Sequence, residues 1–480
     1  MGNTFSTHTG DSLRDCIEAL SNGRTRFAGF PDSPVYQAAW VKPYNLEIQV
    51  TPAAVVRPQT AEDVAGVVQC AAAYGVKVQA RSGGHSYGNH GLGGVDGAVS
   101  IDLVNFQQFS VDNTTWLATV GAGTHLKDVA HKLHDAGGRA IAMGVSPGIG
   151  IGGHATIGGL GPSSRMWGSC LDHVVEVEVV TADGRIERAS DERNPDLFWA
   201  LKGAASGFGI ITEFVFRTNP EPATIVQYDY TIAIGSQATM ASSYSAWQDL
   251  VADPALDRRF ASLYTMMPLG ALITGTFHGT EAEFRATGIP ARLSQAMGSQ
   301  PSITISDWLG SLTHVAEKQA LALSDIPIHF RSKSLAFRRE DLPTPDRVRA
   351  LFEWVDDQHM GADLWFVIFD ASGGAVADVA MNATAFAHRD KVLYYQSYMA
   401  GLYLDQRAKT FVDQLHVQIL GASPAAEGTY PGYVDPALSD AQRHYWGTNL
   451  PQLQALKQIW DAEDVFHNPQ SVRAVWSGGH

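Results

Sequence analysis

A strand, helix and strand pattern between residues 47 and 81 constrains the fold of this chain more than any other stretch. Thr60 and Asp63 are spaced as a helix start, with a hydroxyl cap and a carboxylate in the first turn. Apolar residues then recur at helical spacing, at positions 64, 67, 68 and 71. A second strand pattern ends at Arg81. The stretch predicts a β-α-β unit that delivers the chain to a glycine-containing loop.

The chain has 480 residues, which is more than one hydrophobic core usually organises. We predict an α+β fold with two domains and a returning C-terminal segment. Residues 1–217, rich in glycine turns, form the first domain. Residues 218–414 have longer amphipathic strands separated by helices, which predicts an antiparallel sheet covered by helices. Residues 415–480 contain a helix with an apolar face, and we expect it to return to the first domain.

The charge balance favours a small-molecule ligand. With 34 basic and 49 acidic residues, the net charge of -15 disfavours nucleic acid and acidic membranes as general partners. No run of about 18 apolar residues is present, so no membrane-spanning segment is predicted. The cysteines lack CxxC spacing, and no metal is expected. Interfaces between domains are where small molecules preferentially bind.

Two features favour an exported protein. Cys16 and Cys70 are the natural disulfide pair, which leaves Cys170 as a buried free thiol. Asn113 and Asn382 begin glycosylation sequons, which are used only in secreted chains. We therefore expect a secreted protein whose signal peptide has been removed, with an intracellular location as the alternative.

The stretch Gly148–Gly153 contains GxGxxG, the spacing of a dinucleotide-binding fingerprint. That fingerprint requires a strand before it and a helix opening at its third glycine. Here Pro147 comes first and further glycines follow, so a Rossmann site is not predicted. So many glycines still indicate that the backbone approaches another group closely.

The loop Arg81–Tyr87, RSGGHSY, carries the stronger signal. Gly83 and Gly84 leave backbone N–H groups able to face a pyrophosphate. His85 adds a nucleophilic imidazole beside them. The loop on its own is equally compatible with a glycine turn that holds a buried histidine.

Four stretches together resemble one known family: RSGGHSYG, GIGIGGHATIGGLG, DLFWALKGAASGFGIITEF and YWGTNLPQLQALKQIWDAEDVFHNPQSV. They are similar to the berberine-bridge-enzyme-like FAD-linked oxidases of the vanillyl-alcohol-oxidase superfamily, and most similar in appearance to the fungal oligosaccharide oxidases. The resemblance implies a two-domain fold, with an FAD-binding domain and a substrate domain whose antiparallel sheet is covered by helices.

The resemblance implies that His85 bonds the 8α-methyl group of FAD. Many members add a second bond from a cysteine, and Ser146 occupies that position here. A serine alkoxide is not accessible near neutral pH as a thiolate is, so we predict a single covalent bond. The implied cofactor-binding residues are Arg81, Ser82, Gly83, Gly84, His85, Ser86, Tyr87, Ser146, Gly150, Gly152, Gly153, His154, Gly158, Gly159, Gly209, Ile211, Tyr445 and Asn449.

The resemblance also implies a catalytic base. The family's Y-x-N-Y-x-D segment is matched by residues 430–435, which makes Tyr433 the base, although Gly432 replaces the usual asparagine. Asp370 matches an aspartate that partners this tyrosine in the oligosaccharide oxidases. Because a phenol near pKa 10 is mostly protonated at neutral pH, Tyr433 needs such help.

The predicted substrate pocket contains Ile368, Tyr395 and Ser397. Sugar-oxidising relatives carry glutamines where Ile368 and Ser397 are expected to align, so the pocket should be less polar than theirs. Aromatic residues on these strands are otherwise more often core.

The implied reaction is oxidation of a hydroxyl group on a small, carbohydrate-like substrate. Proton abstraction accompanies hydride transfer to flavin N5, and molecular oxygen becomes hydrogen peroxide. One alternative is oxidation or oxidative cyclisation of a secondary metabolite or aromatic alcohol, and another is a non-catalytic flavin-binding protein. Ile151 lies at a position that varies among the relatives and lines the approach of oxygen. This residue does not decide whether the enzyme is an oxidase or a dehydrogenase.

Overall fold

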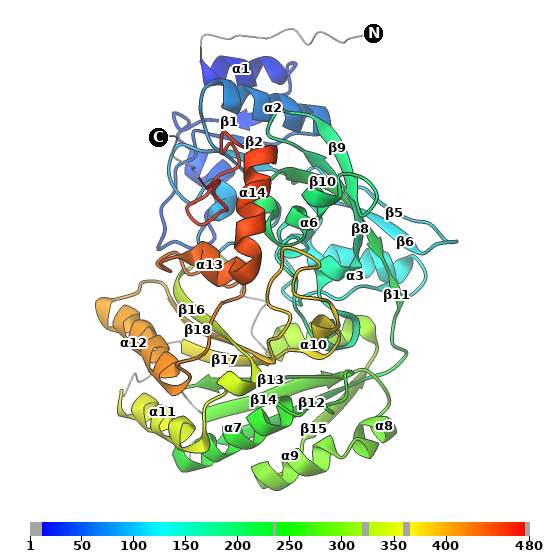
Figure 1. Cartoon of the computed structure of the whole chain (residues 1–480), viewed down its shortest axis with the longest axis vertical. Helices are drawn as coiled ribbons and strands as arrows, with labels where there is room; N and C mark the ends of the chain where they lie inside the picture. Colours follow the sequence, from blue (N-terminus) through cyan, green and yellow to red (C-terminus); the bar gives the residue numbers. More distant parts are fainter. Residues whose placement is uncertain (1–11, 234–236, 269, 319–325, 359–364, 476–480) are drawn as a thin grey trace.

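A computed structural model describes residues 12–233, 237–268, 270–318, 326–358 and 365–475 (Figure 1). Two main sheets build the upper half of the view. The four-stranded sheet has the order β1-β2-β4-β3, with β1 (Ala28–Gly29), β2 (Ala54–Val56), β3 (Val78–Arg81) and β4 (Val99–Asp102). The five-stranded sheet has the order β5-β6-β10-β8-β9, with β5 (Phe109–Val111), β6 (Leu117–Gly121), β8 (Val174–Val180), β9 (Ile186–Ser190) and β10 (Ile210–Arg217). A small pair joins β7 (Arg139–Ala140) to β11 (Asn219–Pro220).

The lower half is built on one antiparallel sheet of seven strands, in the order β15-β12-β14-β13-β17-β18-β16. Its strands are β12 (Ile225–Ala233), β13 (Phe260–Met267), β14 (Gly270–Phe277), β15 (Ser302–Ser306), β16 (His329–Phe337), β17 (Trp365–Ala371) and β18 (Leu393–Gly401). Helices α7 (Gln237–Val251), α11 (Pro345–Asp357) and α12 (Gln406–Ala422) cover its outer face (Figure 1). The architecture confirms the predicted α+β fold with a helix-covered antiparallel sheet.

The remaining helices surround these sheets. They are α1 (Leu13–Leu20), α2 (Ala61–Ala73), α3 (Leu126–Asp135), α4 (Ile151–His154), α5 (Ser164–Trp167), α6 (Pro195–Ala204), α8 (Glu281–Ala286), α9 (Ile289–Met297), α10 (Trp308–Lys318), α13 (Ala441–Trp446) and α14 (Leu450–Trp460). Short helical turns are η1 (Gln37–Val41), η2 (His90–Leu92), η3 (Cys170–His173), η4 (Ala205–Gly207), η6 (Arg339–Asp341), η7 (Gly374–Asp378) and η8 (Gly447–Asn449).

The predicted β-α-β unit is present. Helix α2 begins after Thr60, whose side chain accepts a hydrogen bond from the Asp63 backbone N–H. Strands β2, β4 and β3 are parallel, as a helical crossover requires. Strand β3 ends at Arg81, so the glycine loop starts at the carboxyl edge of this sheet.

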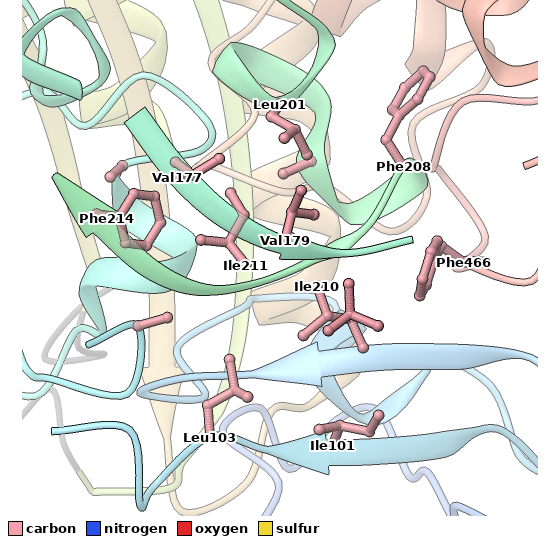
Figure 2. Packing of buried hydrophobic residues seen from close by; sticks show 14 of the residues in the cluster. Ile101, Leu103, Val177, Val179, Leu201, Phe208, Ile210, Ile211, Phe214 and Phe466 are labelled. Carbon is pink, nitrogen blue, oxygen red and sulfur yellow. The ribbon is translucent and has the colours of Figure 1, made fainter. Parts of the chain in front are cut away.

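One hydrophobic core joins the four-stranded and five-stranded sheets. Figure 2 shows Ile210 of β10 between the side chains of β8 and α6 on one side and Ile101 and Leu103 on the other. Phe466, from the C-terminal segment, packs in the same core. Because both sheets share this core, the loops between them are held at fixed positions.

The C-terminal helix packs on the first domain, beside α6 (Figure 1). Its Lys457 is fully buried, and the ammonium donates to the carbonyl oxygens of Gly207 and Phe466, at 2.7 and 3.0 Å, and to the Asp461 carboxylate, at 2.6 Å. A buried charge is tolerated only when it is paired and hydrogen-bonded in this way. Strands β12 to β18 all lie within the segment predicted as the second domain.

Two buried arginines tie the domains together. Arg389 forms a two-point ion pair with Asp172, at 2.7 and 2.8 Å, and its side chain is only 2% exposed. Burial opposes the ionisation of Asp172, but its hydrogen bonds with Arg389 hold its pKa below the usual value. Arg165 donates to the carbonyl oxygens of Phe260 and Ser372. The interface therefore depends on cations whose partners lie across it.

A disulfide joins Cys16 of α1 to Cys70 of α2, while Cys170 is a buried free thiol. Across the described ranges, none of the helices combines the length and apolar character that a membrane crossing needs.

Replacing Arg389 by methionine should lower the free energy of unfolding by about 3–5 kcal/mol, because Asp172 would keep a buried, uncompensated charge. Urea denaturation followed by tryptophan fluorescence measures the change. The control is Arg258→Met, which removes an ion pair with Asp378 whose side chains are 55% and 53% exposed and should cost less than about 1 kcal/mol. Equal losses in the two variants would contradict the assigned role of Arg389.

Candidate active site

One cavity runs between the first domain and the seven-stranded sheet. Its first-domain wall comes from the loop after β3, the glycine-rich stretch around α4, and the segment between α6 and β10. Its other wall comes from the open faces of β13, β14, β17 and β18. The predicted site residues that line it are Arg81, Ser82, Gly83, Gly84, His85, Ser86, Tyr87, Ser146, Gly150, Gly152, Gly153, His154, Gly209, Ile211, Ile368, Asp370, Tyr433 and Tyr445.

The loop after β3 is fixed by Arg81. Its guanidinium donates to Asp102 at 2.6 Å, to the Trp40 carbonyl oxygen at 3.0 Å and to the Val41 carbonyl oxygen. The Ser82 hydroxyl donates to the Ala122 carbonyl oxygen at 2.6 Å. These bonds leave the backbone at Gly83 and Gly84 facing the cavity.

The two glycine loops touch through their backbones. A Cβ atom on Gly83 would collide with the Gly148 carbonyl oxygen and the Gly150 nitrogen, and one on Gly150 would collide with Ser82. The Gly152 N–H donates to Ala122, the same carbonyl oxygen that accepts from Ser82. Glycine is therefore required by close approach, and Gly84 is required additionally by its φ of +77°.

His85 begins a row of aromatic contacts that reaches the substrate-domain sheet. The ring of Tyr44 lies 4.6 Å from that of His85, and Tyr87 contacts Tyr398 of β18 at 5.7 Å between centroids. Tyr87 also shares a hydrogen bond with the Tyr398 hydroxyl. This row connects the glycine loop to the opposite wall of the cavity.

Ser146, which is predicted not to form a second covalent bond with FAD, lies on the cavity wall. Ser146 is buried there. Nearby, His154 accepts a hydrogen bond from the Gly144 N–H through Nε2, at 2.9 Å. Burial lowers the pKa of His154 to about 4, so this imidazole is neutral at physiological pH.

Tyr433 and Asp370 line the same cavity, although they come from different parts of the chain. Tyr433 lies in the loop before α13, where Tyr430 packs edge-on against it with centroids 5.0 Å apart. Burial raises the pKa of Tyr433 well above its usual value, and the charge of Asp370 raises it further. Burial raises the pKa of Asp370 to about 7. No described residue gives the Asp370 carboxylate a hydrogen bond, so its proton affinity is left high.

The loop that carries Tyr433 is held at both ends. The Tyr430 hydroxyl accepts from the Gly159 N–H at 2.8 Å, and the Ser334 hydroxyl donates to the Tyr433 carbonyl oxygen at 3.1 Å. Lys333 pairs with Asp435 at 2.6 Å. These contacts hold the Tyr433 side chain in place. The sequence had indicated this residue only through the family resemblance.

The prediction that Tyr395 and Ser397 line the pocket is wrong. The Tyr395 hydroxyl donates to Ser397 at 2.9 Å, and the Tyr395 ring packs in the core beneath the covering helices. Because side chains alternate across a strand, a one-residue error in alignment reverses the face. Gln396 and Tyr398 line the cavity instead.

Three predicted cofactor residues lie outside the cavity lining: Gly158, Gly159 and Asn449. The N–H of Gly159 is used by Tyr430, and the Asn449 amide donates to the Met381 and Thr384 carbonyl oxygens. Their roles are to hold loops next to the cavity. Tyr44 and Gln396 were not predicted as wall residues, and Tyr398 was left unassigned among the strand aromatics that are more often core.

Comparison with known proteins identifies this arrangement. A family model described as "FAD binding domain" matches residues 52–190, and one described as "Berberine and berberine like" matches residues 429–473. The FAD-linked oxidoreductase sorD of Penicillium rubens is 37% identical over 95% of this chain and 97% of the relative. The chain belongs to the berberine-bridge-enzyme-like family of FAD-linked oxidoreductases.

Other members of the family include sugar oxidases. The xylooligosaccharide oxidase of Thermothelomyces thermophilus is 32% identical over 90% of this chain and 89% of the relative. A solved structure, the xylooligosaccharide oxidase from Myceliophthora thermophila C1 in complex with xylobiose, matches with a TM-score of 0.87 and 30% identity, covering 96% of this chain and 99% of the other. The chain is thus an enzyme, as the sequence predicted, and FAD is its cofactor.

The cavity of this berberine-bridge-enzyme-like protein fits FAD. The contact between Gly83 and the Gly148–Gly150 backbone forms a cradle that any Cβ would fill, and backbone N–H groups there can face a pyrophosphate. Ile210 and Ile211 offer apolar surface further along the cavity, suited to an aromatic ring. Among the described residues, no group of three or more His, Cys, Asp or Glu side chains could hold a metal ion.

Replacing Gly83 by alanine should cost about 1–3 kcal/mol of stability, because the methyl group must push two backbones apart. The variant should also carry less FAD per chain. Melting temperature and the flavin-to-protein absorbance ratio report the two effects.

Gly421→Ala is the matched control, since that glycine lies in α12 with no atom within 4 Å of an added Cβ. It should gain up to about 1 kcal/mol and keep its flavin. Normal flavin content in the Gly83 variant would show that the close contact does not shape the cofactor site.

Proposed function

We propose that this enzyme is an FAD-dependent oxidase, with FAD held by one covalent bond from His85, that oxidises a hydroxyl group of a small carbohydrate-like molecule. The observation that carries the proposal is that Tyr433 and Asp370 line one cavity together with the His85 loop, and that the Asp370 charge acts on Tyr433. When bound, the flavin would supply a hydride acceptor at N5 and, with oxygen as the final acceptor, the chemistry that yields hydrogen peroxide. The sugar oxidases among the relatives support this assignment.

The two side chains act on the substrate proton as one unit. Burial and the Asp370 charge both raise the pKa of Tyr433, so a standing phenolate is not the base. Asp370, with a pKa of about 7, is partly ionised near neutral pH and can accept a proton. When bound substrate brings the two side chains into hydrogen-bond contact, Tyr433 takes the substrate proton and passes its own to Asp370, so that two transfers move one net proton from the substrate to the carboxylate.

The cavity retains one amide for substrate binding. The Tyr398 hydroxyl donates to the Gln396 side-chain oxygen, and no described residue accepts from the Gln396 Nε2. This amide can therefore donate to a substrate oxygen. Ile368 still supplies apolar surface where the sugar-oxidising relatives were expected to carry a glutamine.

A second candidate is oxidation of a secondary metabolite or aromatic alcohol. It is favoured by the apolar side chains of Leu263, Val315 and Ile368 on the cavity wall. Screening sugars and aromatic alcohols for hydrogen peroxide release separates the two candidates. Activity only on aromatic alcohols would favour the second.

We also propose that the protein is secreted. The Cys16–Cys70 disulfide is typical of an oxidising compartment. Asn113 and Asn382, which begin the sequons, are both exposed.

The mode of FAD attachment is tested by denaturation, proteolysis and mass analysis. Flavin mass should stay on the peptide that contains His85 and be absent from the peptide that contains Ser146. His85→Ala should release all its flavin on denaturation. Free flavin from the unaltered enzyme, or flavin on the Ser146 peptide, would refute the single histidyl bond.

The rate constant of flavin reduction should rise with pH and level off above about 7, because the Asp370 carboxylate must be ionised to accept a proton. Below that value it should fall about tenfold per pH unit. Tyr433→Phe should lower the rate constant of flavin reduction about 100-fold or more. Asp370→Asn should also lower this rate constant, and its rate constant should no longer fall as the pH drops below about 7. Stopped-flow absorbance of the flavin with an active substrate gives these values. A flat profile in the unaltered enzyme would exclude Asp370 as the acceptor.

A further inference from the structure

A second cavity adjoins the cofactor site, and we call it the basic cleft. Residues 82–85 line both cavities, so the glycine loop is the wall between them. The cleft is otherwise formed by the segments after α1, around η1 and before α3. Its charged and imidazole side chains are Arg24, Arg26, Lys42, Arg57, Arg81, His85, Asp102 and His125.

The charge of the basic cleft is opposite to that of the whole chain. Five arginines and lysines line it against one carboxylate, that of Asp102. Arg24 pairs with Asp63 outside the lining, so the excess is three positive charges when Asp63 is counted. The whole chain carries a net charge of -15. A local positive field on an anionic protein concentrates small anions at that place.

Two of these cations are available to a ligand. Arg57 and Arg81 are both engaged with Asp102, at 3.0 and 2.6 Å. By contrast, Arg26 and Lys42 are exposed, and among the described residues neither side chain has an ion-pair partner. Their charges are therefore not neutralised within the described structure.

The backbone that presents Lys42 has an uncommon conformation. Residues Gln37–Val41 form a π-helical turn, and Lys42 follows it with a φ of +45°. A lysine rarely adopts this left-handed conformation, and π-helical turns occur frequently at functional sites. The same turn supplies the carbonyl oxygens of Trp40 and Val41 that hold Arg81. The cleft and the cofactor loop are thus built from one structural unit.

We propose that the basic cleft binds small anionic electron acceptors, such as acidic quinones, which reoxidise reduced FAD from this side in addition to oxygen. The proposal rests on FAD attachment at His85, because His85 is one of the residues that line both cavities and a flavin bonded to it would lie next to the cleft. Reduced flavin loses two electrons and releases its protons to solvent. Two one-electron acceptors, or one two-electron acceptor, take those electrons.

The test needs no substrate. The FAD-loaded enzyme is photoreduced without oxygen and mixed with ferricyanide, an anionic probe, or with neutral 1,4-benzoquinone. The variant is Arg26→Glu with Lys42→Glu. The matched control is Arg285→Glu with Arg292→Glu, which makes the same charge change at exposed positions of α8 and α9. A low ionic strength of about 10 mM keeps electrostatic screening weak.

The cleft variant should be reoxidised by ferricyanide about tenfold more slowly or worse, while benzoquinone reoxidises it within about twofold of the unaltered rate. The control pair should change ferricyanide reoxidation much less. Calorimetric titration with ferrocyanide, which cannot oxidise the flavin, should show binding to the resting enzyme that weakens about tenfold in the cleft variant only.

Equal slowing of ferricyanide reoxidation in the cleft and control variants would overturn the proposal, as would equal slowing with both acceptors. Absence of ferrocyanide binding to the unaltered enzyme would also overturn it. If FAD is not covalently bonded to His85, denaturation releases the flavin, and this result is distinguished from a failure of the cleft proposal because it requires no electron acceptor.

Discussion

The close contact between two glycine loops is the constraint on which the cofactor site depends. Gly83 lies against the backbone of Gly148–Gly150 with no room for a Cβ atom. The carbonyl oxygen of Ala122 joins the loops by accepting from both Ser82 and Gly152. Backbone groups that pack this closely converge on one ligand, whereas side chains would have kept them apart. The Arg81 guanidinium fixes this contact relative to the parallel sheet.

The chemistry depends on a second constraint, the buried ionic interface between the domains. Asp172 and Arg389 come from opposite sides and neutralise each other without solvent. With the interface closed, Asp370 on β17 faces the same cavity as Tyr433 of the C-terminal segment. Burial keeps the pKa values of both side chains high. The proposed proton relay depends on this environment, which neither domain provides alone.

The glycine loop has one face toward the cofactor cavity and one toward the basic cleft. The charge of this cleft differs from that of the sheet-lined cavity, where Asp370 is the acidic group and Ile368 and Leu263 are apolar. The proposed substrate site and the proposed acceptor site therefore have chemically distinct surroundings. Electrostatics separates them, since a small anion is concentrated near Arg26 and Lys42.

The sequence by itself determined the β-α-β unit, the glycine loops and the family, because periodicity and short motifs are local properties. Thr60 caps α2 as its spacing predicted, and His85 and Ser146 lie on the cavity as expected. Only the tertiary structure decided which face of β18 lines the cavity. Alternation along a strand has two possible phases, and the pairing of Gln396 opposite Ile368 selects one. The tertiary structure also decided the proton affinity of Asp370, because burial by residues far away in sequence sets it.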